Sequence, residues 1–342
     1  MKKVTLVLCV LLSMVLGVGL MGCSKSSSDS TDKSKTTAAD TKGVTAKEVR
    51  IATQPSPFAS PIFVAKAKGF LEDELKKYGV KIKWTSFAAG PPMNEAFAAG
   101  QQDIGLVGDV PLILAKASGQ SRVVFAKVSS GEKTLAVVVK PDSDITDAAG
   151  LKGKKVAVVK GSYGHHLLEL VLEGAGLSLK DIELVNLPVA DINNAVAQGQ
   201  VDAGVVWEPG LSKGISNNLT KVLADGTGIK SNNIFYFATE DFAKNNPVII
   251  EAYIKALEKA KEFIASNPEE AAQLITSDTN LTKEELVALF KEYNYTPAIN
   301  DNDIKELKVV EEFCRAQDLS QNQVDIDKLV NKEFLNNVGI TE

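Results

Sequence analysis

One stretch of this chain occurs twice, and the repeat constrains the possible fold more than any other feature. Residues 94–107 read NEAFAAGQQDIGLV, and residues 193–206, which lie 99 positions later, read NNAVAQGQVDAGVV. The copies share an Asn, two Ala, a Gly-Gln pair, an Asp and a Gly at matching places. Each copy predicts the end of a helix, a turn at the glycine and a short apolar strand. A repeat of this length is too long for a solenoid unit and suits two similar α/β lobes.

Both predicted strands end in a carboxylate that is followed closely by proline. The first copy continues as GDVP, which contains Asp109, and the second as WEP, which contains Glu208. In open α/β sheets the ligand lies beyond the carboxyl ends of the strands. Two such ends, one in each lobe, can face each other across a cleft. We therefore expect an α/β clamshell whose two lobes close on a ligand.

Residues 1–22 have the features of a targeting segment. Lys2 and Lys3 precede an uncharged apolar run from Val4 to Met21, and the run leads to Cys23 in the sequence LMGC. This end resembles a bacterial lipobox, in which the cysteine receives lipid and becomes the first residue of the mature protein. An uncleaved transmembrane anchor is the alternative, because about 18 apolar residues can span a bilayer. The polar residues that follow Cys23 favour a lipoprotein signal peptide.

Residues 23–47 contain almost no bulky apolar side chain and predict a flexible tether. The chain of 342 residues has a net charge of −5, but residues 1–47 hold seven Lys and three Asp, so the remainder carries −9. Such an acidic folded part argues against a nucleic-acid partner. Of the three cysteines, only Cys314 lies outside the signal peptide and lipidation site. We therefore expect no disulfide and a buried structural thiol at this position.

The order of predicted strands and helices indicates where the chain passes between the lobes. We expect residues 48–135 to form the first part of lobe 1, residues 136–236 to form lobe 2, and residues 237–342 to form a helical second part of lobe 1. The crossings are expected near residues 133–137 and 235–238, and the lobes should close about them.

Several motifs, in order along the chain, resemble one family of binding proteins. They are Gln54 with its proline-rich loop, AKAKGFL from residue 65, DIGLVGDVP from residue 103, LKGKKVAV from residue 151, KGSYGH from residue 160 and WEP from residue 207. The chain is similar over residues 49–338 to the sulfonate/nitrate/taurine group of solute-binding proteins of ABC importers, and most similar to the aliphatic-sulfonate members. The resemblance implies a type II periplasmic-binding-protein-like clamshell with a C-terminal helical segment. It also implies a small sulfonate-type organic anion as ligand, an aliphatic sulfonate or taurine, and an ABC permease and ATPase as partners.

The best candidate for holding an oxyanion is the segment from Gly161 to Tyr163, between a predicted strand and a predicted helix. Free amides at a helix start carry partial positive charge and bind sulfonate or phosphate groups. Gly161 would allow close approach, while Ser162 and Tyr163 would add hydroxyl donors. Ser162 could instead only cap its own helix. His165 faces either the cleft or a packed turn, and it makes no metal pair with His166, because neighbours on a helix point to different faces.

Asp109 and Glu208 stand at matching places in the two lobes. If both face the cleft, they repel an anion and suit an amine at the other end of the ligand, as in taurine or an aminopyrimidine. Alternatively, each caps the helix that follows it. Trp207 could stack on an apolar ligand group or pack in the core. The polar residues expected to complete the site follow strand ends of lobe 1, and they are Gln54, Ser56, Ser129 and Ser130.

Catalytic motifs such as G-x-S-x-G, H-E-x-x-H and the phosphate-loop lysine signature are missing. We therefore expect a binding protein with no catalytic residue, no cofactor and no metal, acting as a monomer on the outer face of the cytoplasmic membrane. The alternatives are a carrier of an aminopyrimidine (a thiamine precursor), a carrier of nitrate or bicarbonate, and a sensor lipoprotein. A pyrimidine-synthesising enzyme on the same scaffold would need a histidine set and a cysteine cluster, whereas this chain has two His and one free Cys.

Overall fold

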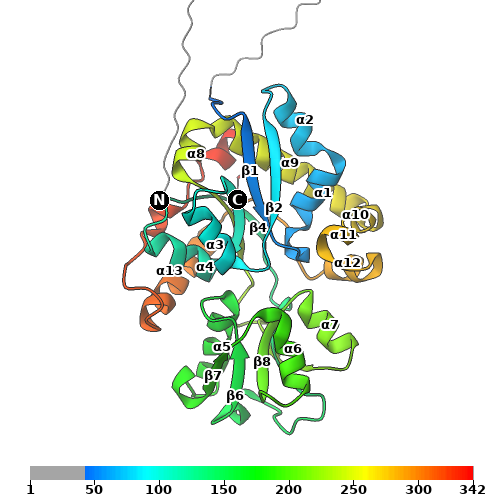
Figure 1. Cartoon of the computed structure of the whole chain (residues 1–342), viewed down its shortest axis with the longest axis vertical. Coiled ribbons are helices and arrows are strands. Elements are labelled where there is room, and N and C mark those ends of the chain that lie inside the picture. The colour runs from blue at the N-terminus through cyan, green and yellow to red at the C-terminus, as the bar shows by residue number, and fades with distance from the viewer. Residues whose placement is uncertain (1–42, 342) are drawn as a thin grey trace, which may run out of the picture. The chain divides into compact units, whose positions relative to one another are not determined.

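Two five-stranded sheets organise the chain in the computed structural model, which describes residues 43–341 (Figure 1). The first sheet has the spatial order β2 (Lys81–Ser86), β1 (Glu48–Thr53), β3 (Ile104–Gly108), β10 (Ile234–Ala238) and β4 (Val123–Ser129). The second sheet has the order β7 (Glu183–Asn186), β6 (Lys155–Val158), β8 (Ala203–Trp207), β5 (Leu135–Val139) and β9 (Lys221–Asp225). In each sheet the first three strands are parallel, and the last two join through antiparallel pairs. The predicted α/β fold with two similar lobes is confirmed.

The repeated asparagines hold equivalent places in the two lobes. Helix α3 (Gly90–Ala98) leads into β3, and α6 (Val189–Ala197) leads into β8. Asn94 Nδ2 donates to the carbonyl of Pro111 at 2.8 Å, and Asn193 Nδ2 donates to the carbonyl of Gly210 at 2.7 Å. Each asparagine thus ties the helix before its strand to the helix after it.

The repeated aspartates join each of these strands to its parallel neighbour. Asp103 Oδ2 accepts from the amide of Arg50 at 2.8 Å, and Asp202 Oδ2 accepts from the amide of Lys155 at 2.8 Å. The glycine that was expected to end each preceding helix has a left-handed φ of +68° in both copies. The sequence repeat therefore records one local structure that is built twice.

Helices cover both faces of the first sheet (Figure 1). The helices before the second lobe are η1 (Pro57–Ala59), α1 (Ser60–Lys68), α2 (Phe70–Lys76), α3 and α4 (Asp109–Ala117). Those after it are α8 (Glu240–Asn245), α9 (Pro247–Ser266), α10 (Pro268–Leu274), α11 (Thr276–Thr279), α12 (Lys283–Leu289), α13 (Asp301–Ala316), α14 (Ile326–Leu329) and α15 (Glu333–Asn337). The second lobe holds η2 (Ala148–Leu151), α5 (Tyr163–Gly174), η3 (Leu179–Asp181), α6 and α7 (Gly210–Ser216).

The C-terminal helices pack on the first lobe, as the sequence predicted. Helix α9 lies against α1 and α2, and α13 lies against α4. Tyr253 of α9 meets the aromatic rings of Phe125 and Tyr236 in the core, with ring centroids 5.8 and 5.2 Å away. Cys314 of α13 is buried, and burial raises the pKa of its thiol to about 12. The expected structural role of this cysteine is therefore confirmed.

The chain passes between the sheets in residues 130–134 and again in residues 226–233. The two crossings are bonded to each other. The amide of Gly226 donates to the carbonyl of Glu132 at 2.9 Å, and the amide of Asn232 donates to the carbonyl of Gly131 at 3.1 Å. The crossings therefore form one connected unit.

The crossings begin and end earlier than the sequence suggested. Leu135 already belongs to β5 of the second sheet, and residues 234–236 already belong to β10 of the first sheet. The segments expected to act as hinges, residues 133–137 and 235–238, thus lie largely inside strands. Each of these strands comes from a continuous apolar run in the sequence. Such a run does not show to which of the two sheets the strand belongs.

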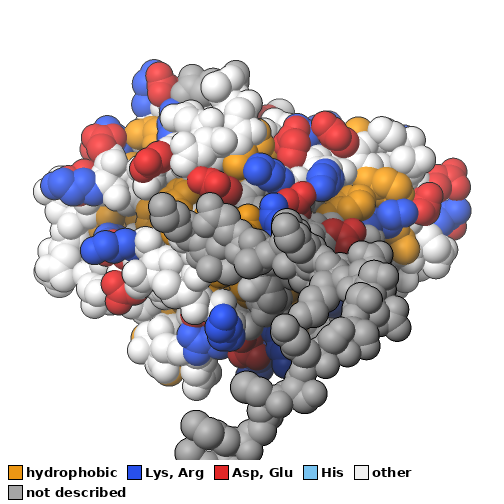
Figure 2. All heavy atoms as spheres, turned by 90° about the horizontal axis from the view of Figure 1, so that it is seen from above, with side chains coloured by type: hydrophobic (Ala, Val, Ile, Leu, Met, Phe, Trp, Pro, Cys, Tyr) orange, Lys and Arg blue, Asp and Glu red, His pale blue; other side chains and the backbone are white. Residues whose placement is uncertain are grey.

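The surface shown in Figure 2 carries described acidic and basic side chains that are interspersed rather than gathered by sign. Among residues 43–341, no helix is long and apolar enough to cross a membrane. The predicted signal peptide, the lipidation site Cys23 and most of the tether lie outside the described residues.

We expect Gly226→Ala to destabilise the fold by about 1–3 kcal/mol, because overpacking forces the backbone to shift. A Cβ atom on Gly226 would lie 2.1 Å from the carbonyl oxygen of Lys230 and 2.6 Å from that of Glu132. The measurement is the free energy of urea unfolding. Gly174→Ala is the matched control, because nothing lies within 4 Å of the added Cβ. Equal stability of the Gly226→Ala variant and the wild type would contradict the packing of the crossings.

Candidate functional site

A cavity of about 390 Å³ lies between the lobes, at the carboxyl ends of strands from both sheets. The first lobe contributes the loop after β1 and the segment after β2, including Gln54, Ser56 and Ala88. The second lobe contributes the start of α6, the end of β8 and one side of α7. This is the position at which an open α/β sheet binds its ligand. We call this cavity the cleft pocket.

Lys213 is the only side chain with a formal charge among the described residues that line the cleft pocket. The other lining groups are neutral: the polar ones include Gln54, Ser56, Asn193, Asn194 and Asn217, and the apolar ones include Val189, Trp207 and Leu219. The pocket therefore combines one positive charge, amide and hydroxyl donors, and an apolar wall. This combination suits a small monoanion with an aliphatic part.

Two hydrogen bonds join the lobes at the cleft pocket. Lys213 Nζ, on α7 of the second lobe, donates to the carbonyl of Asn280 in the first lobe at 2.7 Å. Ser56 Oγ donates to the carbonyl of Glu208 at 3.0 Å. Sequence reasoning missed Lys213, because it is one of many lysines and stands in no motif.

Three residues predicted for the site line the cleft pocket: Gln54, Ser56 and Trp207. Gln54 and Ser56 are buried, and Gln54 Nε2 also donates to the carbonyl of Leu106 at 3.2 Å. The indole of Trp207 packs on the ring of Tyr163, with centroids 4.9 Å apart and planes tilted by 57°. The remaining predicted residues are not among those that line the pocket.

Asp109 does not present a free carboxylate to the cleft. It is buried and forms an ion pair with Lys230, a residue of the second crossing that is also buried. Its Oδ1 also accepts from the amide of Val110 at 2.7 Å. Lys230 was not expected from the sequence, where it stands in a polar loop without any distinguishing pattern.

Glu208 caps the helix that follows it, which is the second of the two interpretations. Its carboxylate accepts from the amide of Ser212 at 3.1 Å and from Ser212 Oγ at 2.8 Å. Burial raises the pKa of the Glu208 carboxyl, although the bonds from Ser212 act in the opposite direction. Both carboxylates that end the repeats are therefore engaged within the protein.

The start of α5 is covered by the first lobe. Ser162 Oγ accepts from the amide of His165 at 3.3 Å, so Ser162 caps its own helix. Gly161 has a φ of +77°, and a Cβ there would lie 3.1 Å from Leu114 of α4. Tyr163 packs so tightly on Gly108 that a Cβ on that glycine would lie 2.2 Å from its ring. In this structure, protein atoms thus occupy the predicted oxyanion-binding site at the start of α5.

The two histidines of α5 are buried against Phe313 of α13. The ring centroids of His165 and His166 lie 5.5 and 4.5 Å from that of Phe313. Burial lowers the pKa of His165 to about 4 and that of His166 to about 2, so both imidazoles are neutral. Neither lines the cleft pocket, and no group of three potential metal ligands occurs among the described residues.

A cluster of buried hydroxyls lies beside the cleft pocket, and we call it the hydroxyl cluster. The hydroxyls of Ser129, Tyr163 and Tyr293 make no hydrogen bond of ordinary geometry to the described residues. Tyr293 lies close enough to Tyr163 and Glu208 to interact electrostatically with both. Buried polar groups without partners are rare in native proteins. The backbone amide and carbonyl of the next residue, Ser130, are hydrogen-bonded to the backbone of Asn294.

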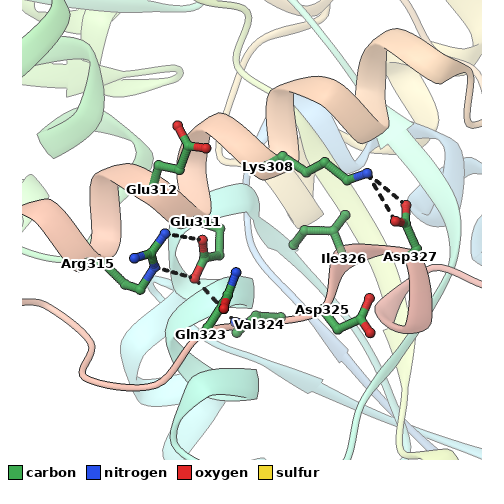
Figure 3. A pocket seen from close by; sticks show the side chains of 9 residues that line it. All are labelled: Lys308, Glu311, Glu312, Arg315, Gln323, Val324, Asp325, Ile326 and Asp327. Atoms are coloured by element: carbon green, nitrogen blue, oxygen red, sulfur yellow. Dashed lines mark hydrogen bonds and ion pairs between the residues drawn. The ribbon is translucent and has the colours of Figure 1, made fainter.

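A further groove lies between α13 and the segment that leads into α14 (Figure 3). Two ion pairs lie in it: Arg315 Nε lies 2.8 Å from Glu311, and Lys308 Nζ lies 3.0 Å from Asp327. Its other acidic residues are Asp325, which pairs with Lys328 outside the groove, and Glu312. All of its lining residues belong to the C-terminal part of the first lobe. The groove therefore has more acidic than basic side chains, which does not suit an anion, and it has no contribution from the second lobe.

The chain is similar in sequence to known binding proteins. A Bacillus subtilis protein named as an aliphatic sulfonates-binding protein is 31% identical over 294 residues, which cover 84% of this chain and 87% of the relative. The taurine-binding periplasmic protein of Escherichia coli is 29% identical over 229 residues, which cover 66% of this chain and 68% of the relative.

Solved structures show the same fold. The periplasmic aliphatic sulphonate binding protein SsuA of Escherichia coli matches with a TM-score of 0.75 and 29% identity, covering 85% of this chain and 99% of that chain. The alkanesulfonate-binding protein SsuA of Xanthomonas axonopodis pv. citri, bound to MOPS, matches with a TM-score of 0.77 and 26% identity, covering 84% and 99%. The model of the NMT1/THI5-like family matches residues 56–271. The chain therefore belongs to the NMT1/THI5-like family.

Proposed function

We propose that this protein is the extracytoplasmic solute-binding component of an ABC importer, and that it captures a small aliphatic sulfonate between its lobes. The observation that carries this proposal is the cleft pocket, whose only formal charge is the ammonium of Lys213. The names of its relatives support it, since they describe aliphatic sulfonate-binding and taurine-binding proteins. The membrane permease and ATPase of the importer are the partners that this role requires.

The ligand lies with its sulfonate at Lys213 and its aliphatic part against Trp207 and Leu219. The ammonium and the pocket amides supply donors to the three sulfonate oxygens, and Trp207 supplies the apolar surface. Lys213 also bonds to Asn280 across the cleft, so its charge acts where the two lobes meet. An anion bound there would favour the closed arrangement of the lobes.

The alternatives with an amine or a planar anion are less well supported. An aminopyrimidine or taurine would offer an amine, but neither Asp109 nor Glu208 lines the cleft pocket. Asp109 is paired with Lys230, and Glu208 accepts from Ser212. A nitrate-binding protein shares the fold with a TM-score of 0.70, but its 16% identity shows the fold alone. The aliphatic sulfonate is thus the ligand that the lining chemistry favours.

We expect Lys213→Met to weaken ethanesulfonate binding by about 1.5–3 kcal/mol, or at least about tenfold in Kd, because a charge-assisted hydrogen bond is lost. Titration calorimetry measures this change. Lys180→Met is the matched control, because it removes the same charge from an exposed position of the second lobe away from the pocket. It should leave Kd nearly unchanged.

Tyr293→Phe serves as the contrast to Lys213→Met. It removes one hydroxyl of the hydroxyl cluster, whose three hydroxyls could also donate to sulfonate oxygens. If Tyr293→Phe weakened binding while Lys213→Met left it unchanged, the sulfonate would lie in the hydroxyl cluster and our placement would be wrong.

We expect the wild type to bind ethanesulfonate more tightly than taurine, and Glu208→Gln to leave that preference unchanged. The reason is that Glu208 is buried behind the pocket lining and accepts hydrogen bonds from Ser212, so its carboxylate is not placed to meet a ligand amine. Calorimetric titration of both proteins with both ligands measures the preference. A loss of about 2–5 kcal/mol for taurine alone in the variant would instead show that Glu208 pairs with the ligand amine.

We further propose that Cys23 carries lipid and anchors the protein, as a monomer, to the outer face of the cytoplasmic membrane. The lipobox-like LMGC and the polar tether motivate this proposal. Cys23→Ala should release the protein or leave its precursor unprocessed, as seen by membrane fractionation and intact-mass spectrometry. A variant that is still processed and membrane-bound would rule out the anchor at this residue.

A further inference from the structure

A second cavity, of about 400 Å³, lies where both crossings meet helices from the two lobes. Glu132 comes from the first crossing, and Ile229 and Lys230 come from the second. Helix α5 of the second lobe and helix α13 of the first lobe complete its walls. None of its lining residues also lines the cleft pocket. We call it the crossing cavity.

The crossing cavity is flanked by aliphatic side chains that face solvent. Ile229 is 45% exposed and Val309 is 51% exposed, and they are two of the four most exposed large apolar residues in the described chain. They stand on different elements, the second crossing and α13. Several exposed apolar side chains converge on one cavity here. Covering such a surface with a ligand is favourable, because it removes apolar area from water.

Two carboxylates of the crossing cavity have only neutral partners. Glu132 Oε2 accepts from the amide of Gly228 at 3.3 Å. Glu306 accepts from Asn302 Nδ2 at 2.8 Å and from Asn233 Nδ2. The one cation that lines the cavity, Lys230, is already paired with Asp109. The cavity therefore keeps two negative charges that no lining cation balances.

His166 provides an independent sign of a ligand. It lines the crossing cavity, it is only 4% exposed, and its Nδ1 has no hydrogen-bond partner among the described residues. Burial keeps the imidazole neutral by lowering its pKa to about 2. A neutral imidazole nitrogen can accept a hydrogen bond from an ammonium group.

We infer that the crossing cavity is a binding site for a small organic cation, a primary ammonium on a short alkyl chain. Its ammonium would lie between Glu132 and Glu306, and its chain would cover Ile229 and Val309. The cavity is built from both lobes and both crossings, so its shape depends on how the lobes are arranged. A bound cation would therefore change the affinity of the cleft pocket for its ligand. This change in affinity rests on the proposed function, whereas the binding of the cation does not.

The test uses the full chain with n-butylammonium as the probe, and binding is followed by titration calorimetry and by NMR. We expect saturable binding to the wild type, weakened about tenfold or more in the double variant Glu132→Gln/Glu306→Gln, since the charge attraction is lost. Glu262→Gln, an exposed change on α9, should bind as the wild type does. Unfolding curves for each variant check that the fold is intact.

A second pair of variants tests the apolar contact. Val309→Ser should weaken n-butylammonium binding several-fold, because it removes apolar surface from the cavity wall. Val222→Ser is the control, because Val222 is 41% exposed and lies on β9 outside the cavity. Saturating n-butylammonium should also shift the Kd of ethanesulfonate by several-fold without competing for its site.

Three results would overturn the inference. The first is no saturable binding of n-butylammonium to the wild type. The second is equal binding to the wild type and to the double variant, and the third is simple competition with ethanesulfonate, which would place the cation in the cleft. A protein that binds no sulfonate but binds n-butylammonium in a Glu132- and Glu306-dependent way would contradict the proposed function and leave this site standing.

Discussion

The buried ion pair between Asp109 and Lys230 is the interaction on which the arrangement of the lobes depends most. The two side chains are 2% and 5% exposed, so removing one partner would leave a charge in the interior, at a cost of about 3–5 kcal/mol. Asp109 begins α4 of the first lobe, and its amide also donates to the carbonyl of Asn233 at 3.3 Å. These contacts tie residues 230–233 to the first lobe. The segments that remain to join the two lobes are then residues 130–134 and 226–229.

The same ion pair shapes the chemistry of the cleft. It neutralises one of the two carboxylates that end the repeated strands, and the helix cap from Ser212 engages the other. Among the described lining residues, Lys213 is then the only one with a formal charge, although residues 48–342 carry −9. An anion therefore enters a locally positive pocket in an acidic protein, and the acidic surface works against long-range attraction of anions. Selection depends on short contacts inside the pocket.

The repeat made much of the fold predictable from the sequence. The shared Asn, Asp and Gly each perform a backbone task that is the same in both lobes, as the bonds of Asn94 and Asn193 show. These tasks recur in both lobes, and a recurring pattern is visible in a sequence. The helical C-terminal part was predictable because the period of a helix is a local pattern.

The site was predictable only in part, because its decisive contacts join distant residues. Gln54 and Ser56 follow the end of β1, and Trp207 ends β8, so strand prediction placed them in the cleft pocket. Lys213 and Lys230 stand on a helix surface and in a loop, and their partners Asn280 and Asp109 are far away in the sequence. The start of α5 met the sequence criteria for an anion-binding site, but Tyr163 and Gly108 fill the space in front of it.

The most direct measurement of the central claim, that a sulfonate binds in the cleft pocket, uses the fluorescence of Trp207. The chain has two tryptophans, so Trp84→Phe leaves Trp207 as the sole indole. Trp84 lies on β2 and is not among the residues that line the cleft pocket. We predict that ethanesulfonate changes the emission of Trp207 saturably, with the same Kd as calorimetry. Calorimetric binding of ethanesulfonate without any change in Trp207 emission would place the ligand elsewhere and contradict this account.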